Sequence, residues 1–86
     1  MASQAGYTVT TTPAKYLEER PGRRRLTIQN KGAVALLVGL GSAANAGSTP
    51  ALSIAVGGMW DPPAPPGDAV WLAAASSTCL VSIIED

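Results

Sequence analysis

The chain has 86 residues, of which 47% are hydrophobic, as expected for one small domain. Six basic side chains balance six acidic ones, so the net charge is zero. It contains one cysteine, Cys79, and no histidine, which excludes an intrachain disulfide, a catalytic couple that needs histidine and a histidine-ligated metal site. The zero net charge also removes a general attraction to nucleic acid or acidic membranes, and we expect neither as a partner. A domain of this size has a thin core and needs an additional source of stability. Since a disulfide and a histidine-ligated metal are excluded, we expect oligomerisation to supply it.

The N-terminal segment predicts an arm and a first strand. Residues 7–12 (YTVTTT) are rich in β-forming residues, and Pro13 closes them, as is typical of an edge strand. Residues 14–20 (AKYLEER) have a helix-like composition but run into Pro-Gly, which favours a short turn or an irregular connection as much as a helix. We therefore predict an arm with an edge strand over residues 1–22 and a folded core over residues 23–86.

The stretch 23–41 (RRRLTIQNKGAVALLVGLG) predicts the two central strands of that core. In the first strand, roughly 24–29, apolar and polar residues alternate over 26–29, as in a half-buried strand, whereas 33–40 is apolar at almost every position. The Asn-Lys-Gly sequence at 30–32 tolerates positive φ angles and predicts a short hairpin loop between the two strands.

The remaining sequence predicts further strands. A small-residue loop over 41–50 comes first and is followed by a strand over 52–56. An extended proline-rich segment covers 59–67, and two closing strands cover 69–74 and 78–85. Six to eight short antiparallel strands without a clear helix predict an all-β fold, a small single-domain β-sandwich or barrel that is jelly-roll-like. The pattern does not choose among jelly roll, other Greek-key sandwich and meander.

The few remaining polar residues give little indication of catalysis. Asp61 and Asp68 are the candidate paired carboxylates, but their positions on either side of a proline-rich loop favour a role in solvating or capping the turn. Cys79 lies in an apolar strand, where a cysteine is most often a small buried hydrophobe. We therefore expect no enzyme activity, no cofactor and no metal.

The distribution of charge and aromatic residues suggests protein contacts. All six basic residues lie within the first 31 positions, and between residues 32 and 84 the only charged side chains are Asp61 and Asp68. Such a surface either contacts other protein or is simply uncharged, and both interpretations stay open. The candidate partner contacts are Tyr7, Arg23, Arg24, Arg25, Trp60, Pro62 and Pro63.

The arginines and Trp60 have alternative interpretations, and Trp60 and Trp71 could equally cap the two ends of the small core. The three arginines could instead begin a solvated strand and pair with Glu18 and Glu19. We expect Trp71 to be the core tryptophan and Trp60 to contact a partner, so that Trp60→Ala would weaken assembly more than the fold.

Four motifs follow one another in a familiar order. They are Arg-x-Leu-x-Ile-x-Asn-x-Gly (24–32), Val-Gly-x-Gly (38–41), Gly-x-x-Trp (57–60), and Val-Trp-x-Ala followed by Thr-x-x-Val-x-Ile-x-Glu as a closing hairpin (70–85). Over roughly residues 20–86 the chain resembles the small all-β virion proteins of tailed bacteriophages, in particular capsid decoration (cement) proteins. The resemblance implies a homotrimer on the capsid surface that bridges major capsid proteins, after synthesis in the host cytoplasm.

Two other classes of function stay open. A head or tail fibre or accessory protein that contacts host-surface carbohydrate would need an exposed aromatic platform, for which Trp60 with Tyr7 or Tyr16 are the candidates. A small cytosolic protein with a ligand pocket would need polar residues in its interior, and the sequence offers few.

Overall fold

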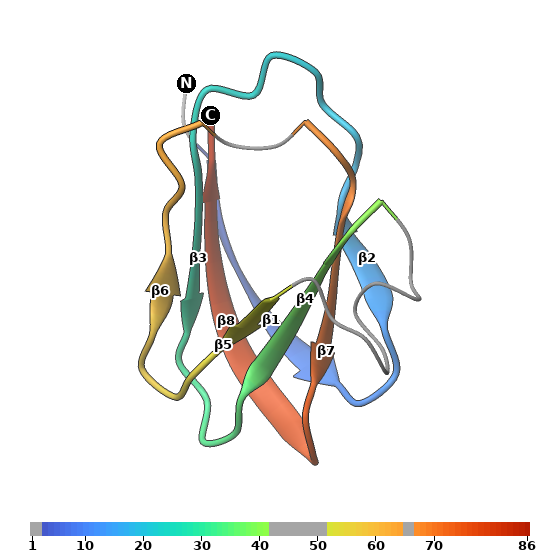
Figure 1. Ribbon diagram of the computed structural model, residues 1–86. Helices are drawn as coiled ribbons and strands as arrows, with labels where there is room; N and C mark the ends of the chain where they lie inside the picture. Colours follow the sequence, from blue (N-terminus) through green and yellow to red (C-terminus); the bar gives the residue numbers. More distant parts are fainter. Residues whose placement is uncertain (1–2, 42–51, 65–66) are drawn as a thin grey trace.

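Residues 3–41, 52–64 and 67–86 are described by the computed structural model of the protein, and they form two packed β-sheets (Figure 1). The strands along the chain are β1 (Ser3–Thr10), β2 (Ala14–Leu17), β3 (Leu26–Asn30), β4 (Leu36–Leu40), β5 (Leu52–Ile54), β6 (Met59–Trp60), β7 (Val70–Ala74) and β8 (Thr78–Glu85). No helix occurs in the described ranges. The prediction of a small all-β sandwich with six to eight short antiparallel strands is confirmed.

The strand order defines a jelly roll. Sheet A has the order β1-β8-β3-β6 and sheet B the order β2-β7-β4-β5, and all neighbours are antiparallel. The pairs β1–β8, β2–β7, β3–β6 and β4–β5 form one long antiparallel ribbon, which is rolled up so that successive pairs alternate between the two sheets. Two four-stranded sheets built in this way are the jelly-roll architecture.

The predicted hairpin within residues 23–41 is wrong. Both strands exist, as β3 and β4, but β3 pairs with β6 and β8 in sheet A, whereas β4 pairs with β5 and β7 in sheet B. Residues 31–35 therefore cross from one sheet to the other. The closing strands β7 and β8 also lie in different sheets, with residues 75–77 crossing between them, so they too are not a hairpin. Of the predicted loop over residues 41–50, all but Gly41 lies outside the described residues.

The N-terminal segment belongs to the sandwich and does not form an arm. β1 pairs with β8 along its whole length, and Val9 is fully buried in the core. β2, in a segment predicted to be a turn or an irregular connection, pairs with β7 and has a bulge between Lys15 and Leu17. Residues 3–17 thus supply an edge strand to each sheet, which confirms the edge strand but corrects the predicted boundary at residue 22.

Alternate residues of the strands build the core between the sheets. In β8, Cys79, Val81 and Ile83 are buried while Thr78 and Leu80 are exposed, so the expectation that Cys79 is a small buried hydrophobe is confirmed. The core cluster consists of Val9, Leu26, Ile28, Leu36, Val38, Ile54, Val70, Leu72, Ala74, Cys79, Val81 and Ile83. Each large side chain buried there stabilises the fold by about 1.5–3 kcal/mol relative to an exposed one.

Asn30 closes the core at the end of the sandwich that Figure 1 draws at the bottom, where β1–β2, β3–β4, β5–β6 and β7–β8 are connected. Its side chain is fully buried, and its Nδ2 donates to the carbonyls of Val34 (2.8 Å) and Ile54 (2.9 Å). Its Oδ1 accepts from the Gly32 N–H (2.9 Å) and the Cys79 thiol (3.0 Å). The Asn-Lys-Gly sequence therefore forms a hydrogen-bonded corner between the sheets.

Candidate partner interface

The seven residues predicted as partner contacts do not form one surface. Tyr7 is on β1 and Trp60 is on β6, which are the opposite edges of sheet A. The arginines at 23–25 precede β3 and lie at the end of the sandwich that carries the C-terminus (Figure 1). The structure thus separates the candidates into three places.

Arg23 is a structural residue. Its side chain is 0% exposed, and its Nε lies 2.8 Å from Oε2 of Glu85. The guanidinium also donates to the carbonyl oxygens of Asp68 (3.2 Å) and Glu18 (2.9 Å). It therefore holds the β2–β3 connection, the segment before β7 and the end of β8 together. This corrects the expectation that all three arginines face a partner.

Arg24 and Arg25 are exposed, and their backbones continue the β3–β8 ladder. Their N–H groups donate to the Asp86 carbonyl at 2.7 and 3.1 Å, and the Asp86 N–H donates to the Arg25 carbonyl at 3.0 Å. The Arg24 side chain, 77% exposed, lies 3.5 Å from the Asp86 carboxylate. Solvent screens an ion pair this exposed, so it contributes little, and the two arginines are accessible to an acidic partner.

The structure places the two tryptophans differently from the prediction of a core Trp71. Trp60 lies opposite Ile28 on β3 and packs against the core, partly buried. Trp71 is also partly buried, but it points to the other face of β7 from the buried Val70 and Leu72. Among the buried side-chain N and O atoms that the structure describes, Trp71 Nε1 is the one without a hydrogen-bond partner. The prediction that Trp71 is the core tryptophan is wrong.

The proline-rich segment follows Trp60 at the edge of sheet A. Pro62 is half-buried and Pro63 is exposed. Asp61 between them and Trp60 accepts a hydrogen bond of 3.0 Å from the Thr27 hydroxyl. The two prolines therefore remain accessible beside a tryptophan that is itself part of the fold.

Tyr7 forms an aromatic pair at the opposite edge. Its ring centroid lies 5.0 Å from that of Tyr16 in a T-shaped arrangement, and both rings pack against the core. The pair joins the first edge strand of sheet A to that of sheet B. Since the tyrosines and Trp60 pack against the core and lie at opposite edges, they do not combine into one exposed aromatic platform.

The structure identifies a surface that the sequence analysis missed, on the outer face of sheet A. Its exposed apolar side chains are Met59 (60% exposed) and Leu80 (56% exposed). Strand register places Met59 in one row with Gln29, Ser82 and Gly6, and Leu80 in the next row with Thr8 and Lys31. We call this surface the sheet A face; it consists of Gly6, Thr8, Gln29, Lys31, Met59, Leu80 and Ser82. One sequence signal could have found it, because Leu80 falls between Thr78 and Ser82 in the solvent-facing phase of its strand.

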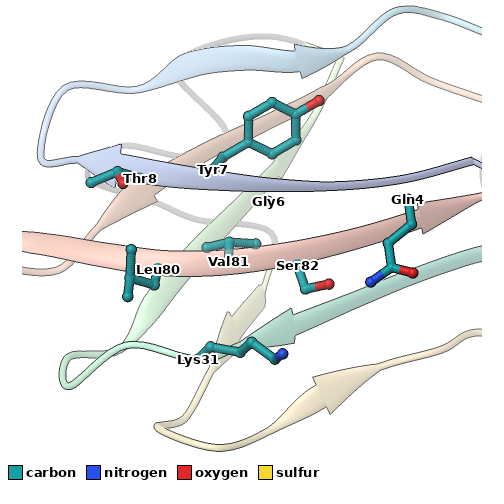
Figure 2. Close-up of a pocket in the computed structure, with 8 residues that line it drawn as sticks. All are labelled: Gln4, Gly6, Tyr7, Thr8, Lys31, Leu80, Val81 and Ser82. Atoms are coloured by element: carbon teal, nitrogen blue, oxygen red, sulfur yellow. The ribbon is translucent and has the colours of Figure 1, made fainter.

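A shallow depression of about 370 Å³ opens on the sheet A face. Its lining residues, drawn in Figure 2, are Gln4, Gly6, Tyr7, Thr8, Lys31, Leu80, Val81 and Ser82. The Tyr7 ring extends away from Gln4, Ser82 and Lys31 (Figure 2), in keeping with its place on the core side of β1. The depression is thus bounded by short polar side chains, one lysine and one leucine.

Nowhere in the described ranges do three or more histidine, cysteine, aspartate or glutamate side chains gather so as to hold a metal ion. Nor do those ranges contain a helix with the length and apolar character to cross a membrane. The exposed side chains of the sheet A face and of Arg24 and Arg25 are the candidate contact surfaces.

The comparisons with known proteins bear on the fold. No protein-family model matches the chain, and no curated protein matches it. A solved structure of Bacillus endospore appendages, described as a novel family of disulfide-linked pili, superposes with a TM-score of 0.50 at 14% sequence identity. The match covers 99% of this chain and 84% of that one. The two proteins therefore share a fold across nearly all of the present chain.

Proposed function

We propose that the protein is a structural component of a tailed-phage virion, which decorates the capsid and stabilises it by bridging major capsid proteins. The observation that carries the proposal is the sheet A face, where Met59 and Leu80 are exposed among short polar residues with Lys31 as the single charge. A surface with exposed apolar residues and few charges suits contact with protein. The motif resemblance to decoration proteins and the jelly-roll topology, an architecture of many viral capsid domains, support the same proposal.

The proposed mode of action is multivalent. On a capsid lattice, each copy makes modest contacts through the sheet A face and through the exposed Arg24 and Arg25. Many such contacts around the shell sum to a large stabilisation because every further contact within an attached oligomer forms at high effective concentration. We propose a homotrimer as that oligomer, with no catalytic step.

The contacts in this proposal are noncovalent. The Bacillus appendages with the similar fold are described as disulfide-linked pili. In the present chain Cys79 is the single cysteine; it is 1% exposed, and its thiol donates to Asn30 Oδ1. A buried thiol in this position does not reach a second copy without local unfolding, so assembly relies on packing and ion pairs.

The test measures the mass of the purified protein by light scattering and then its sedimentation with expanded, undecorated phage heads. We expect a trimer, or a monomer that trimerises on the shell, to sediment with the heads in fixed ratio. Leu80→Lys and Met59→Lys place charges on the sheet A face and should each weaken binding about tenfold or more. Ser53→Lys is the matched control, because Ser53 is exposed on β5 of the other sheet.

Two results would count against the proposal. One is a stable monomer that stays in the supernatant at all head concentrations. The other is equal binding of the wild type and both sheet A variants, which would remove this surface from the interface. The first result favours the second candidate, a head or tail fibre or accessory protein that contacts host-surface carbohydrate.

A further inference from the structure

Gly6 is a glycine that the fold does not require. It lies in the middle of β1 opposite Ser82, in a register that is continuous from Ser3 to Thr10, so it marks no bulge. It is not among the residues with positive φ. A Cβ built at Gly6 would meet the Val81 carbonyl oxygen at 3.8 Å, an ordinary contact.

Gly32 shows the contrast. A Cβ at that position would lie 2.8 Å from the Leu80 nitrogen and 2.9 Å from the Cys79 sulfur, so the fold itself requires glycine there. A glycine inside a strand weakens the strand, and apart from bulges and bends its usual reason is the close approach of a ligand or another backbone. Gly6 lies in no bulge or bend, so the close approach of a ligand or another backbone is the reason that remains for it. Gly6 also forms part of the depression on the sheet A face.

The groups around Gly6 are suited to a polar ligand. Gln4, Thr8 and Ser82 carry amide and hydroxyl groups that can both donate and accept hydrogen bonds. In Figure 2 the Gln4 amide extends over β8 towards the Ser82 hydroxyl. The Lys31 side chain lies on the same side of β8. Leu80 adds an apolar wall that is 56% exposed. The volume of about 370 Å³ is at the lower end of the range for small-molecule sites.

Lys31 gives the depression a single, uncompensated positive charge. None of the eight lining residues is acidic. Lys15, Arg20, Arg23 and Arg24 form ion pairs in the described structure, but Lys31 is absent from these pairs. An ammonium group without a carboxylate neighbour favours an anionic group of the ligand.

We propose that this depression binds a small hydroxylated carboxylate, of the class of the uronic acids, with the carboxylate at Lys31 and the hydroxyl groups at Gln4, Thr8 and Ser82. The depression shares five residues with the sheet A face, so a bound ligand and a capsid protein would exclude each other at this surface. A peptide that added to sheet A as a further strand would bind the free edge of β1 in the plane of the sheet. The depression instead lies on the face of β1 and β8, and its size suits one or two sugar rings.

The experiment is an NMR titration of the isotope-labelled protein with D-glucuronate, with D-glucose as the neutral control. We expect saturable shifts at Gly6, Lys31 and Ser82 with a dissociation constant on the order of millimolar, and no saturable shift with glucose. Lys31→Gln should weaken binding about tenfold, because it removes one charge-assisted contact. Lys15→Gln is the control, since Lys15 pairs with Glu18 on the other sheet.

Gly6→Thr is the second variant, because it fills the depression. Its Cβ fits the backbone, and threonine suits a strand, so the spectrum should stay dispersed while glucuronate binding is lost. Absence of saturable shifts with glucuronate, or equal binding of glucose, would overturn the proposal. So would tighter binding of a tetraglutamate peptide, which would identify the depression as a contact for acidic protein. A sugar oligomer ending in glucuronate tests whether the acid is recognised free or at a chain end.

Discussion

The buried guanidinium of Arg23 and the carboxylate of Glu85, 62 residues apart in the chain, form an ion pair with an N···O distance of 2.8 Å. Arg23 is part of a run of three arginines, but its neighbours Arg24 and Arg25 are exposed. The pair closes one end of the sandwich, and the buried Asn30 closes the other. Each end of the small core therefore depends on one polar side chain with several partners.

Arg23→Gln should lower the free energy of unfolding by about 3 kcal/mol, because removing one partner of a buried pair leaves the other uncompensated. The carbonyls of Asp68 and Glu18 also lose their donor. Urea unfolding measures the change. Arg25→Gln, at an exposed side chain, should stay within about 0.5 kcal/mol of the wild type. Equal effects of the two variants would contradict a structural role for Arg23.

Asn30→Ala should also destabilise the protein by about 2–4 kcal/mol. The buried side chain has four hydrogen-bond partners, and the variant leaves the Ile54 carbonyl and the Gly32 N–H without theirs, each at a cost of about 1–3 kcal/mol. Gln29→Ala, at the partly exposed neighbour, is the matched control for loss of an amide. A midpoint of denaturation that moves equally for both variants would refute the assignment of Asn30 as the corner of the fold.

Burial raises the pKa of the Cys79 thiol above its ordinary value of 9.0, and this outweighs the opposite effect of a backbone hydrogen bond from Gly32. Between 9.0 and the folded-state pKa, the unfolded chain loses the proton while the folded chain keeps it, so stability falls as the pH rises through that window. Below pH 9.0 the thiol contributes no pH dependence.

The measurement is urea unfolding from pH 7 to pH 11 for the wild type and for Cys79→Ala. The difference between their pH profiles isolates the thiol from tyrosine and lysine titration. We expect the wild type alone to show the additional loss above pH 9.0. Iodoacetamide should label the native thiol much more slowly than the thiol in urea, and rapid native labelling would contradict the buried position.

Trp60→Ala should lower the stability by about 2–3 kcal/mol, because its partly buried ring packs against the core. The structure thus revises the expectation that this substitution acts mainly on assembly. Thermal unfolding and sedimentation with phage heads separate the two effects. Pro63→Ala, at an exposed residue of the same segment, should leave the unfolding temperature nearly unchanged. A Trp60→Ala protein of wild-type stability that fails to sediment with heads would restore the original expectation.

Much of the local structure could be predicted from the sequence. The alternation of apolar and polar residues located β3, because the pleat of a strand sends successive side chains to opposite faces whatever the strand pairs with. The apolar neighbours of Cys79 predicted that it is buried, and it is. Turn residues marked most strand ends. The same pleat places Leu80 with Thr78 and Ser82 on the exposed face of β8.

The sequence by itself determined the all-β class, most of the strands and the burial phase of several of them, since these depend on residues close together in the chain. Only the tertiary structure decided which strands pair. The backbone groups of a strand can form hydrogen bonds with any neighbouring strand, so the pairing depends on how the two apolar faces meet across the core. It is therefore the tertiary structure that made the Asn-Lys-Gly sequence a corner, buried Arg23 against Glu85 and brought Gly6 and Lys31 to the same depression.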